Sequence, residues 1–510
     1  MSGRSDVAVV QGLRSASAVL LNEDSLGEPA TRKQLGQFFT PDAVSDFMAS
    51  LLETRPDEVD LLDAGAGAGA LTAAAVRHFY ALPNPPKRIA VTAYELDTRV
   101  IASLRETLLQ SGRLCEGRGI SYSAAVHNED FIAAAARMAG GGLFDAAPRR
   151  FNVAIVNPPY RKIRSDSPAR GLLRGAGIET SNLYTGFVEL ITMLLAEGGE
   201  LAAITPRSFC NGPYFRPFRE RLLATMSLRR IHVFESRSSA FRSDAVLQEN
   251  VIFHAVKGGP RPRRIIISSS SGTPGDPITE RPVDFSQVVS PDDPERFIHL
   301  AIDDAHAKAK AAMGRLSSTL ASLGLTASTG RVVDFRARAH LRQEPGHDTA
   351  PLIYPCHFAG LFVSWPREKS RKPQAVVSNE RTIDLLVPAG VYVLVKRFTA
   401  KEERRRVVAS IYDPERIPAP MVGFENHLDY FHLQGRGLPM PLAKGLAAFL
   451  NSTVVDVYFR QFSGHTQVNA TDLRSLPYPS KAALETLGRR IDGSDLSQDQ
   501  IDALVDEVLF

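Results

Sequence analysis

The sequence predicts a doubly wound α/β domain with a mostly parallel sheet of about seven strands, followed by a second domain of mixed α+β structure. From about residue 59, short apolar segments alternate with helical patterns, which is typical of strand–helix repeats. The apolar segments are almost continuously hydrophobic, as expected of strands that are covered by helices on both faces. The alternation ends at 257–264 (KGGPRPRR), whose glycine, proline and arginine content indicates a domain boundary.

The individual elements follow from the period of their apolar residues. Strands are expected at 59–63, 89–95, near 122–127, and at 151–156, 200–205, 229–234 and 247–256. Helices between them include 70–80, 97–110 and 183–196. We therefore expect a loosely structured lead-in at 1–30, the α/β domain at 31–257 and the second domain at 258–510.

Composition excludes several classes of protein. The chain has 510 residues, of which 44% are hydrophobic and 23% charged, so it is long enough for two or three ordinary globular domains. The three cysteines, Cys115, Cys210 and Cys356, are far apart and have no metal-ligand spacing. We expect no metal and no disulfide framework, and a reducing bacterial cytoplasm fits best. No stretch approaches the roughly 20 apolar residues that span a bilayer, so no membrane association is expected. The net charge of +4 is only a weak hint towards polyanions.

A glycine-rich turn follows the first expected strand. Residues 61–71 read LLDAGAGAGAL, so the strand runs into Asp63 and then into Gly65 and Gly67 before a helix begins. Glycines let a ligand approach the backbone closely, although such strings also form plain turns. The next strand ends in Glu95, whose carboxylate could accept hydrogen bonds from both ribose hydroxyls of a nucleoside.

A third candidate, Asp130-Phe131, follows the strand after that. The carboxylate could accept a hydrogen bond from an adenine amino group, and the phenyl ring could stack on the base. The alternative is a helix N-cap followed by a core aromatic residue. The order of the three features favours a nucleoside site, because open α/β sheets bind ligands at the carboxyl ends of successive strands.

The tetrapeptide Asn157-Pro158-Pro159-Tyr160 directly follows the apolar strand FNVAIV. Its two prolines fix the backbone and remove two amide donors. The carbonyl of Pro158 and the amide oxygen of Asn157 then offer two acceptors, which suit a planar NH₂ group. Accepting both hydrogens favours a tetrahedral nitrogen with its lone pair aimed at an electrophile, and Tyr160 can stack on the base. The alternative is a tight structural turn.

Together these segments resemble the gamma class of N6-adenine DNA methyltransferases. In that class a motif containing Thr-Pro comes first, then the cofactor loop, then NPPY, then a target-recognition domain, and this sequence keeps that order. The segments that carry the resemblance are GQFFTP (36–41), DAGAGAGAL (63–71), Glu95, NEDF (128–131) and NPPY (157–160).

The resemblance implies a Rossmann-like methyltransferase domain that binds S-adenosylmethionine and flips an adenine out of duplex DNA. It implies that Thr40 and Pro41 help hold the methionine portion of the cofactor, that Glu95 holds the ribose, and that Asp130-Phe131 hold the adenine. It also implies that a downstream aromatic residue stacks on the flipped base. Phe241 matches that position, with ordinary packing as the alternative.

Within the class, the stretch AAFLNSTVVDVYFRQFSGHTQVNATDLRSLPYP (447–479) resembles the PstI-type modification methylases. This implies the modification enzyme of a restriction–modification system, with a possible separate endonuclease as its partner. One departure is the loop AGAGAG, which stands where the class commonly has a proline- and cysteine-containing form. The departure loosens the assignment of individual loop atoms.

Two segments of the second domain are candidates for DNA contact. The run 396–406 (KRFTAKEERRR), beginning with Lys396 and Arg397, has six basic residues against two acidic ones, with a solvated helix face as the alternative. The segment 463–469 (SGHTQVN) is rich in side chains that bind phosphates or base edges, with a polar loop as the alternative. Its candidate residues are His465, Thr466, Gln467 and Asn469.

Other functions also fit parts of this pattern. Methylation of a protein glutamine amide poses the same chemical problem as the adenine amine, and an RNA adenine is a further alternative. A rival of another class is a non-catalytic DNA-binding protein with the same fold, against which the intact NPPY motif speaks. Glu249-Asn250-Val251 and Pro355-Cys356 resemble two motifs of the 5-cytosine methyltransferases, but they occur in reverse order and are taken as coincidence.

Overall fold

The structure is a computed structural model of the chain, and it describes residues 40–140, 150–234, 249–272, 275–399, 403–464, 466–493 and 496–510. The expected lead-in at 1–30 lies outside these ranges. Contacts within the chain divide it into two compact units. The first comprises the chain up to Cys210 together with Tyr214–Asp292, and the second comprises Asn211–Pro213 and Asp293–Phe510. Of the helices described, none combines the length and the apolar character needed to cross a membrane.

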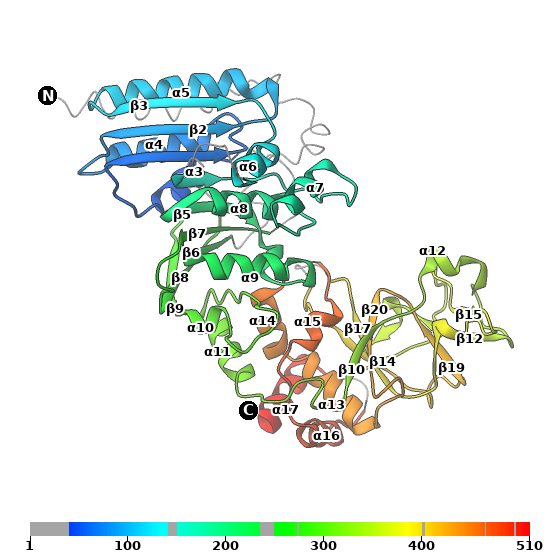
Figure 1. The fold of residues 1–510 in the computed structure, drawn as a ribbon. Coiled ribbons are helices and arrows are strands. Elements are labelled where there is room, and N and C mark those ends of the chain that lie inside the picture. The colour runs from blue at the N-terminus through cyan, green and yellow to red at the C-terminus, as the bar shows by residue number, and fades with distance from the viewer. Residues whose placement is uncertain are drawn as a thin grey trace. The chain divides into compact units, whose positions relative to one another are not determined.

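The first unit is built on a nine-stranded sheet with the order β3-β2-β1-β4-β5-β7-β6-β8-β9 (Figure 1). Neighbours among β1 to β5 pair in parallel, whereas β7 runs antiparallel to both β5 and β6. The strands are β1 (Glu58–Ala64), β2 (Arg88–Tyr94), β3 (Ser121–His127), β4 (Phe151–Val156), β5 (Leu195–Pro206), β6 (Met226–Phe234), β7 (Asn250–Lys257), β8 (Arg264–Ser270) and β9 (Thr279–Asp284). The predicted doubly wound sheet is therefore confirmed, and each of its seven expected strands is present.

The sheet is two strands longer than the seven expected. β8 pairs in parallel with β6, and β9 pairs antiparallel with β8, so both continue the same sheet. The Gly- and Pro-rich segment 257–264 is a connection between β7 and β8, and the first unit extends to Asp292. The sequence pattern predicts a domain boundary at this segment, but turn residues mark the ends of strands whether or not a domain ends there.

Helices cover both faces of this sheet. On one face, α3 (Asp42–Ser50), α4 (Ala70–Ala81) and α5 (Ile101–Glu116) share an apolar cluster with inward residues of β1, β2, β4, β5 and β7. Phe253 follows Ile252 of that cluster and therefore points to the opposite face. There its ring contacts Phe209, which in turn contacts Phe218 of α9 (Arg216–Thr225). On this side α8 (Leu183–Leu194) contacts α9 and α6 (Phe131–Gly140), and α6 contacts α7 (Pro168–Gly175).

The second unit is mixed α+β, as predicted. Its six-stranded sheet has the order β10-β20-β17-β18-β14-β13, and its five-stranded sheet has the order β11-β15-β12-β19-β16. The strands of the first are β10 (Thr326–Thr329), β20 (Leu428–His432), β17 (Tyr392–Lys396), β18 (Ala409–Tyr412), β14 (Phe362–Val363) and β13 (Phe358–Ala359). Those of the second are β11 (Leu341–Arg342), β15 (Ala375–Val377), β12 (Thr349–Ile353), β19 (Met421–Phe424) and β16 (Leu386–Pro388).

Helices pack on the larger of these sheets to form the main core of the unit. They are α11 (Asp304–Met313), α13 (Met440–Leu450), α14 (Thr453–Phe462), α15 (Ala470–Arg474), α16 (Lys481–Arg489) and α17 (Gln498–Leu509). α13 and α16 cross closely, because a Cβ on Gly445 would overlap the carbonyl of Leu484, and one on Gly488 would overlap the carbonyl of Pro441. The short helix α12 (Asp334–Ala337) lies apart from them, beside the smaller sheet (Figure 1).

Candidate active site

The carboxyl ends of β1, β2 and β3 stand side by side, because Ala64 pairs with Tyr94 and Tyr94 pairs with His127. The glycine turn leaves β1 at this edge. The amides of Gly65 and Ala66 both donate to the carbonyl of Tyr94, at 2.8 and 2.9 Å. Gly65, Gly67 and Gly69 have φ values of 84°, 55° and 88°, a conformation that side-chain-bearing residues rarely adopt. The alternating glycines of the sequence are thus required by the backbone path of the turn.

Glu95 closes the glycine turn from the neighbouring strand. Its Oε2 accepts a hydrogen bond from the amide of Gly67 at 2.8 Å, and its Oε1 accepts one from the amide of Asp97 at 2.7 Å. The side chain is only 4% exposed, and this burial raises its pKa. These two bonds orient the carboxylate at the edge of the glycine turn.

Asp63 lies fully buried at the end of β1. Its Oδ2 accepts a hydrogen bond from the hydroxyl of Thr72 in α4 at 2.6 Å, whereas its Oδ1 has no hydrogen-bond partner in the structure. Burial raises the pKa of Asp63 to about 7, and the nearby negative charge of Glu95 adds to the shift. The glycine turn therefore has beneath it a carboxyl group with one acceptor atom unused.

Asp130 and Phe131 begin helix α6. The Oδ1 of Asp130 accepts a hydrogen bond from the amide of Ile132 at 2.8 Å, and the Asp130 side chain is exposed. Phe131 is 3% exposed, and its ring contacts those of Tyr94 and Phe187 with centroids 5.4 and 5.1 Å apart. Asp130 thus makes the helix-capping bond, and Phe131 packs in the core at the sheet edge, which is the structural alternative considered from the sequence.

The NPPY segment lies against both the glycine turn and the Thr-Pro segment. The Asn157 Nδ2 donates to the hydroxyl of Thr40 at 3.0 Å, although the two residues are 117 positions apart. Pro41 follows Thr40 and caps the N-terminus of α3. A Cβ on Gly65 would lie 3.8 Å from the carbonyl oxygen of Asn157 and 4.0 Å from the Phe187 ring. Three motifs that are distant in sequence therefore meet in one place.

Tyr160 is fixed by the end of β5 and by α8. Its hydroxyl donates to the carbonyl of Ile204 at 3.2 Å, and its ring meets that of Tyr184 edge-on, with centroids 6.4 Å apart. The Tyr184 hydroxyl forms a hydrogen bond of 2.9 Å with that of Ser208. Burial raises the pKa of Tyr160, so it remains a neutral phenol at physiological pH. Pro158 beside it is buried, and Asn157 and Pro159 are partly exposed.

The structure thus brings together Thr40, Asp63, the glycine turn, Glu95, Phe131 and Asn157–Tyr160. Sequence reasoning missed the ring of Phe187, which links the glycine turn to Phe131, and the pair Tyr184 and Ser208 behind Tyr160. No local signal could have revealed Phe187 or Tyr184, because buried aromatic residues are expected on a helix between two layers. Phe241 lies outside the described residues.

The segment Glu249-Asn250-Val251, which resembles a motif of the 5-cytosine methyltransferases, has a structural role in this protein. Glu249 and Arg207 form a buried ion pair of 3.2 Å, and the Arg207 amide donates to the Glu249 carbonyl at 2.7 Å. These bonds join the end of β5 to the start of β7. Pro355-Cys356 belong to the second unit, in a short 3₁₀ helix. Among the residues described, no cluster of His, Cys, Asp and Glu is placed to hold a metal ion.

In the second unit, several basic side chains of the run 396–406 form hydrogen bonds or ion pairs within the unit itself. The Arg397 Nη1 donates to the carbonyl of Asn426 at 2.6 Å, and its Nε lies 3.6 Å from the buried carboxylate of Asp429. Arg406 is buried, and its guanidinium donates to the Thr399 carbonyl and, at 3.1 Å, to the Ser463 hydroxyl.

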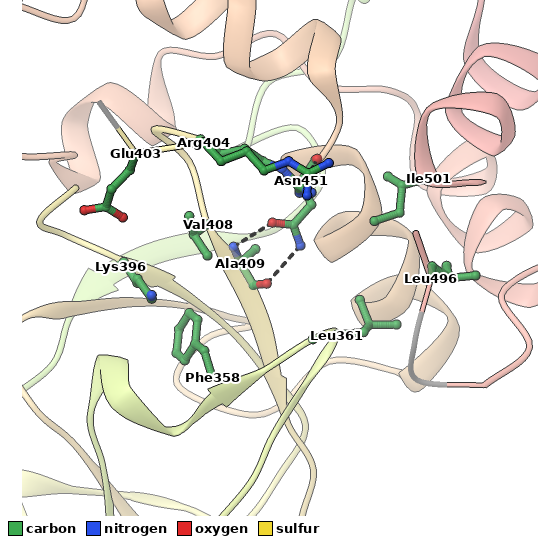
Figure 2. A pocket seen from close by; sticks show the side chains of 12 residues that line it. Phe358, Leu361, Lys396, Glu403, Arg404, Val408, Ala409, Asn451, Leu496 and Ile501 are labelled. Atoms are coloured by element: carbon green, nitrogen blue, oxygen red, sulfur yellow. Dashed lines mark hydrogen bonds between the residues drawn. The ribbon is translucent and has the colours of Figure 1, made fainter. Parts of the chain in front are cut away.

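Three other cations of the run border a cavity of about 350 Å³ (Figure 2). Arg405 donates to the carbonyl of Asn451 at 2.6 Å, and the ammonium of Lys396 lies 5.6 Å from the centroid of the Phe358 ring. Arg404 is exposed at the same cavity. Of the described cations of the run, Lys396 and Arg404 thus have side chains that the fold does not use for hydrogen bonds.

The polar segment 463–469 lies against the same run. The Thr399 amide donates to the carbonyl of Thr466 at 3.1 Å, and Gln467 pairs with Phe398 as an isolated bridge. Asn469 caps α15, with its amide and its side-chain nitrogen both directed to Asp472. Thr466 is exposed and Gln467 is partly exposed, whereas His465 lies outside the described residues.

The chain is similar to known proteins over nearly its whole length. A family model described as Eco57I restriction-modification methylase matches residues 116–241. The type II methyltransferase M.PstI of Providencia stuartii is 43% identical over 98% of this chain and 97% of its own length. M.BsuBI of Bacillus subtilis is 42% identical over 94% and 95%. A solved structure, the type IIG restriction endonuclease BpuSI, aligns at 15% identity with a TM-score of 0.41, covering 92% of this chain and 62% of that one.

The doubly wound sheet with its glycine turn and NPPY segment is the fold of a methyltransferase catalytic domain. Because two relatives exceed 40% identity over nearly the whole chain, the protein belongs to the type II methyltransferases of restriction–modification systems, the family of M.PstI and M.BsuBI.

Proposed function

We propose that the protein transfers a methyl group from S-adenosylmethionine to the N6 amino group of an adenine that is flipped out of duplex DNA. The observation that carries the proposal is the placement of Asn157. Its amide nitrogen is held by Thr40, and its backbone carbonyl lies beside the glycine turn. These contacts support the inference that the Asn157 side-chain oxygen and the adjoining Pro158 carbonyl accept the two hydrogens of an amine.

The residues at the sheet edge fit the cofactor. The turn has no side chains at its glycines, Glu95 is oriented by two backbone bonds, and Asp63 keeps an unused acceptor. Thr40, Pro41, Asp63, Gly65 and Gly67 would hold the methionine part, Glu95 the ribose, and Asp130 with Phe131 the adenine. The cofactor supplies a methyl group that is already activated on a sulfonium, so the protein needs no metal to activate it.

The chain contributes positioning and electrostatics. Asn157 and Pro158 accept both amine hydrogens, which turns the nitrogen lone pair out of the plane of the base and towards the methyl carbon. The bound cofactor would supply the methyl group and keep the sulfur as a neutral thioether, and the methylated nitrogen would lose one proton to solvent. Tyr160 is held by the Ile204 carbonyl and can stack on the base, and Phe241 is proposed to stack on its other side.

We assign catalysis to the first unit and target recognition to the second. The second unit would contact the duplex through Lys396, Arg397, His465, Thr466, Gln467 and Asn469. Of these, Arg397 and Asn469 already make bonds within the fold, so Lys396, Thr466 and Gln467 are the stronger candidates. Methylation by this protein would protect DNA in the cytoplasm against a separate endonuclease of the same specificity.

The test is transfer of labelled methyl groups from S-adenosylmethionine to unmethylated bacterial DNA, followed by digestion to nucleosides. We expect label in N6-methyladenine, and a loss of at least about 100-fold in rate for Asn157→Ala, since it removes a preorganised acceptor at the reacting group. Equilibrium dialysis should show unchanged cofactor binding by the variant. No label in DNA, with cofactor binding intact, would overturn the proposal and favour a protein or RNA substrate or a non-catalytic DNA-binding role.

A further inference from the structure

An aromatic side chain stands in solvent on the short helix α12 of the second unit. Phe335 is 77% exposed, although a phenyl ring is among the side chains that folding most strongly removes from water. The guanidinium of Arg336 lies 5.5 Å from the centre of its ring. An exposed aromatic residue beside arginine is a feature of surfaces that stack on nucleic-acid bases.

Helix α12 is held firmly by its other side. The carboxylate of Asp334 accepts a hydrogen bond of 2.8 Å from the hydroxyl of the buried Tyr354, and it forms an ion pair of 3.0 Å with Lys372. Ala337 is buried in the apolar cluster of the smaller sheet, together with Leu352. These contacts fix the orientation of the helix, so the exposure of Phe335 is built into the fold.

A second segment, 366–373, lies beside this helix. The Gln343 Nε2, just after β11, donates to the carbonyls of Ser370 and Lys372 at 2.7 and 3.3 Å. β11 also pairs with β15, which directly follows the segment, through Arg342 and Ala375. With the ion pair from Lys372 to Asp334, these bonds join 366–373 to the start of α12.

The two segments, together with the 3₁₀ helix Arg338–His340 that follows α12, carry cations that the fold does not neutralise. Within the described ranges, no carboxylate lies within ion-pair distance of these four exposed side chains: Arg336, Arg338, Lys369 and Arg371. The acidic residues in the segments are Asp334, which is already paired with Lys372, and the exposed Glu368. The surface is therefore positive as well as aromatic, and we name Phe335 with these four cations the α12 surface.

We propose that the α12 surface is a duplex-DNA contact of the second unit, in which Arg336, Arg338 and Arg371 bind backbone phosphates and Phe335 packs against a sugar or a base step. The proposal rests on the proposed function, because it identifies a surface that would bind the duplex DNA substrate of that function. Charge decides the occupant, because an exposed ring alone would suit an apolar protein partner, whereas unneutralised cations around it match a polyanion.

The proposal predicts two separable effects on binding to a 30-base-pair duplex of random sequence. Arg336→Ala with Arg338→Ala should reduce the slope of log affinity against log salt by about 2, since each lost phosphate contact removes about 0.9. Phe335→Ala should weaken binding at least about fivefold with little change of slope, because an apolar contact neutralises no phosphate and so releases no counterions. The lysine double variant, Arg336→Lys with Arg338→Lys, should keep the wild-type slope.

A matched control lies on α5 of the first unit, where exposed Arg105 and Leu109 also place a cation beside an apolar side chain. Arg105→Ala with Leu109→Ala should bind like the wild type. The proposal is overturned if the α12 variants, with unchanged melting temperatures, also bind like the wild type while the wild type methylates DNA. If the wild type neither binds the duplex nor methylates DNA, the proposed function fails, and the inference that rests on it fails too.

Discussion

The carboxyl edge of the sheet in the first unit and the basic run 396–406 in the second differ in what the fold leaves available. At the sheet edge, polar groups are buried and oriented, yet an acceptor atom of Asp63 is left without a hydrogen bond among the described residues. In the basic run, the arginines that look most suited to phosphates donate instead to carbonyls of the second unit's own backbone. Charge in a sequence therefore says less about a binding surface than charge that remains unneutralised in the folded chain.

The largest expected effect is on the free energy of unfolding. It is tested by comparing two arginines of the basic run, one buried and one exposed. Arg406→Ala should lower the free energy of unfolding by about 4 kcal/mol, because it leaves a cavity and strands the Thr399 carbonyl and the Ser463 hydroxyl in the interior. Arg404→Ala, at an exposed position, should change it by less than about 0.5 kcal/mol. Urea denaturation of both variants measures the difference, and equal stabilities would contradict this account of the run.

A smaller effect concerns the pH dependence of stability at the sheet edge. The pKa of Asp63 is about 7 in the folded chain, above its value of about 4 when unfolded, so the folded state favours the protonated carboxyl. Stability from this group is present below about pH 4 and is lost as pH rises towards 7, by at most about 4 kcal/mol for about three units at 1.4 kcal/mol per unit. Asp63→Asn should remove that part of the decline.

The measurement is the unfolding free energy of wild type and Asp63→Asn at intervals between pH 4 and 8. Asp57, exposed near the start of the same strand, offers Asp57→Asn as the control, which should follow the wild-type curve. Parallel curves for wild type and Asp63→Asn would show that folding does not raise the pKa of the Asp63 carboxyl.

The smallest effect tests the bond that joins the Thr-Pro and NPPY segments. Thr40→Val keeps the shape of the side chain but removes the hydroxyl that accepts from Asn157 at 3.0 Å. One hydrogen bond is worth about 1 kcal/mol, so the methylation rate should fall about fivefold. Thr40→Ser, which keeps the hydroxyl, should restore most of the rate, and equal rates for the valine and serine variants would exclude a positioning role.

Much of the fold followed from local pattern. The seven expected strands and the helices between them are present, because continuous apolar runs bounded by turns leave few other structures for strands covered on both faces. The two added strands, β8 and β9, were missed since Gly-Pro-Arg segments end strands as readily as domains. Glu95 and the glycine turn were identified because they follow strand ends, where side chains are not needed for the core.

Other features had no local signature. The hydrogen bond between Asn157 and Thr40, the packing of Phe187 beside Gly65, and the bonds that occupy Arg406 all join residues separated by tens of positions or more, or depend on which face of an element is buried. Phe335 gave no signal either, because an apolar residue is expected to be buried until its surroundings are known.

The sequence by itself determined the order of the elements, the glycine turn and the NPPY segment, because backbone restriction by glycine and proline and the period of apolar residues are local properties of the chain. The tertiary structure alone decided which polar groups are used up and which are left to bind. That outcome depends on which groups from distant segments lie within hydrogen-bonding distance, and only packing sets those distances.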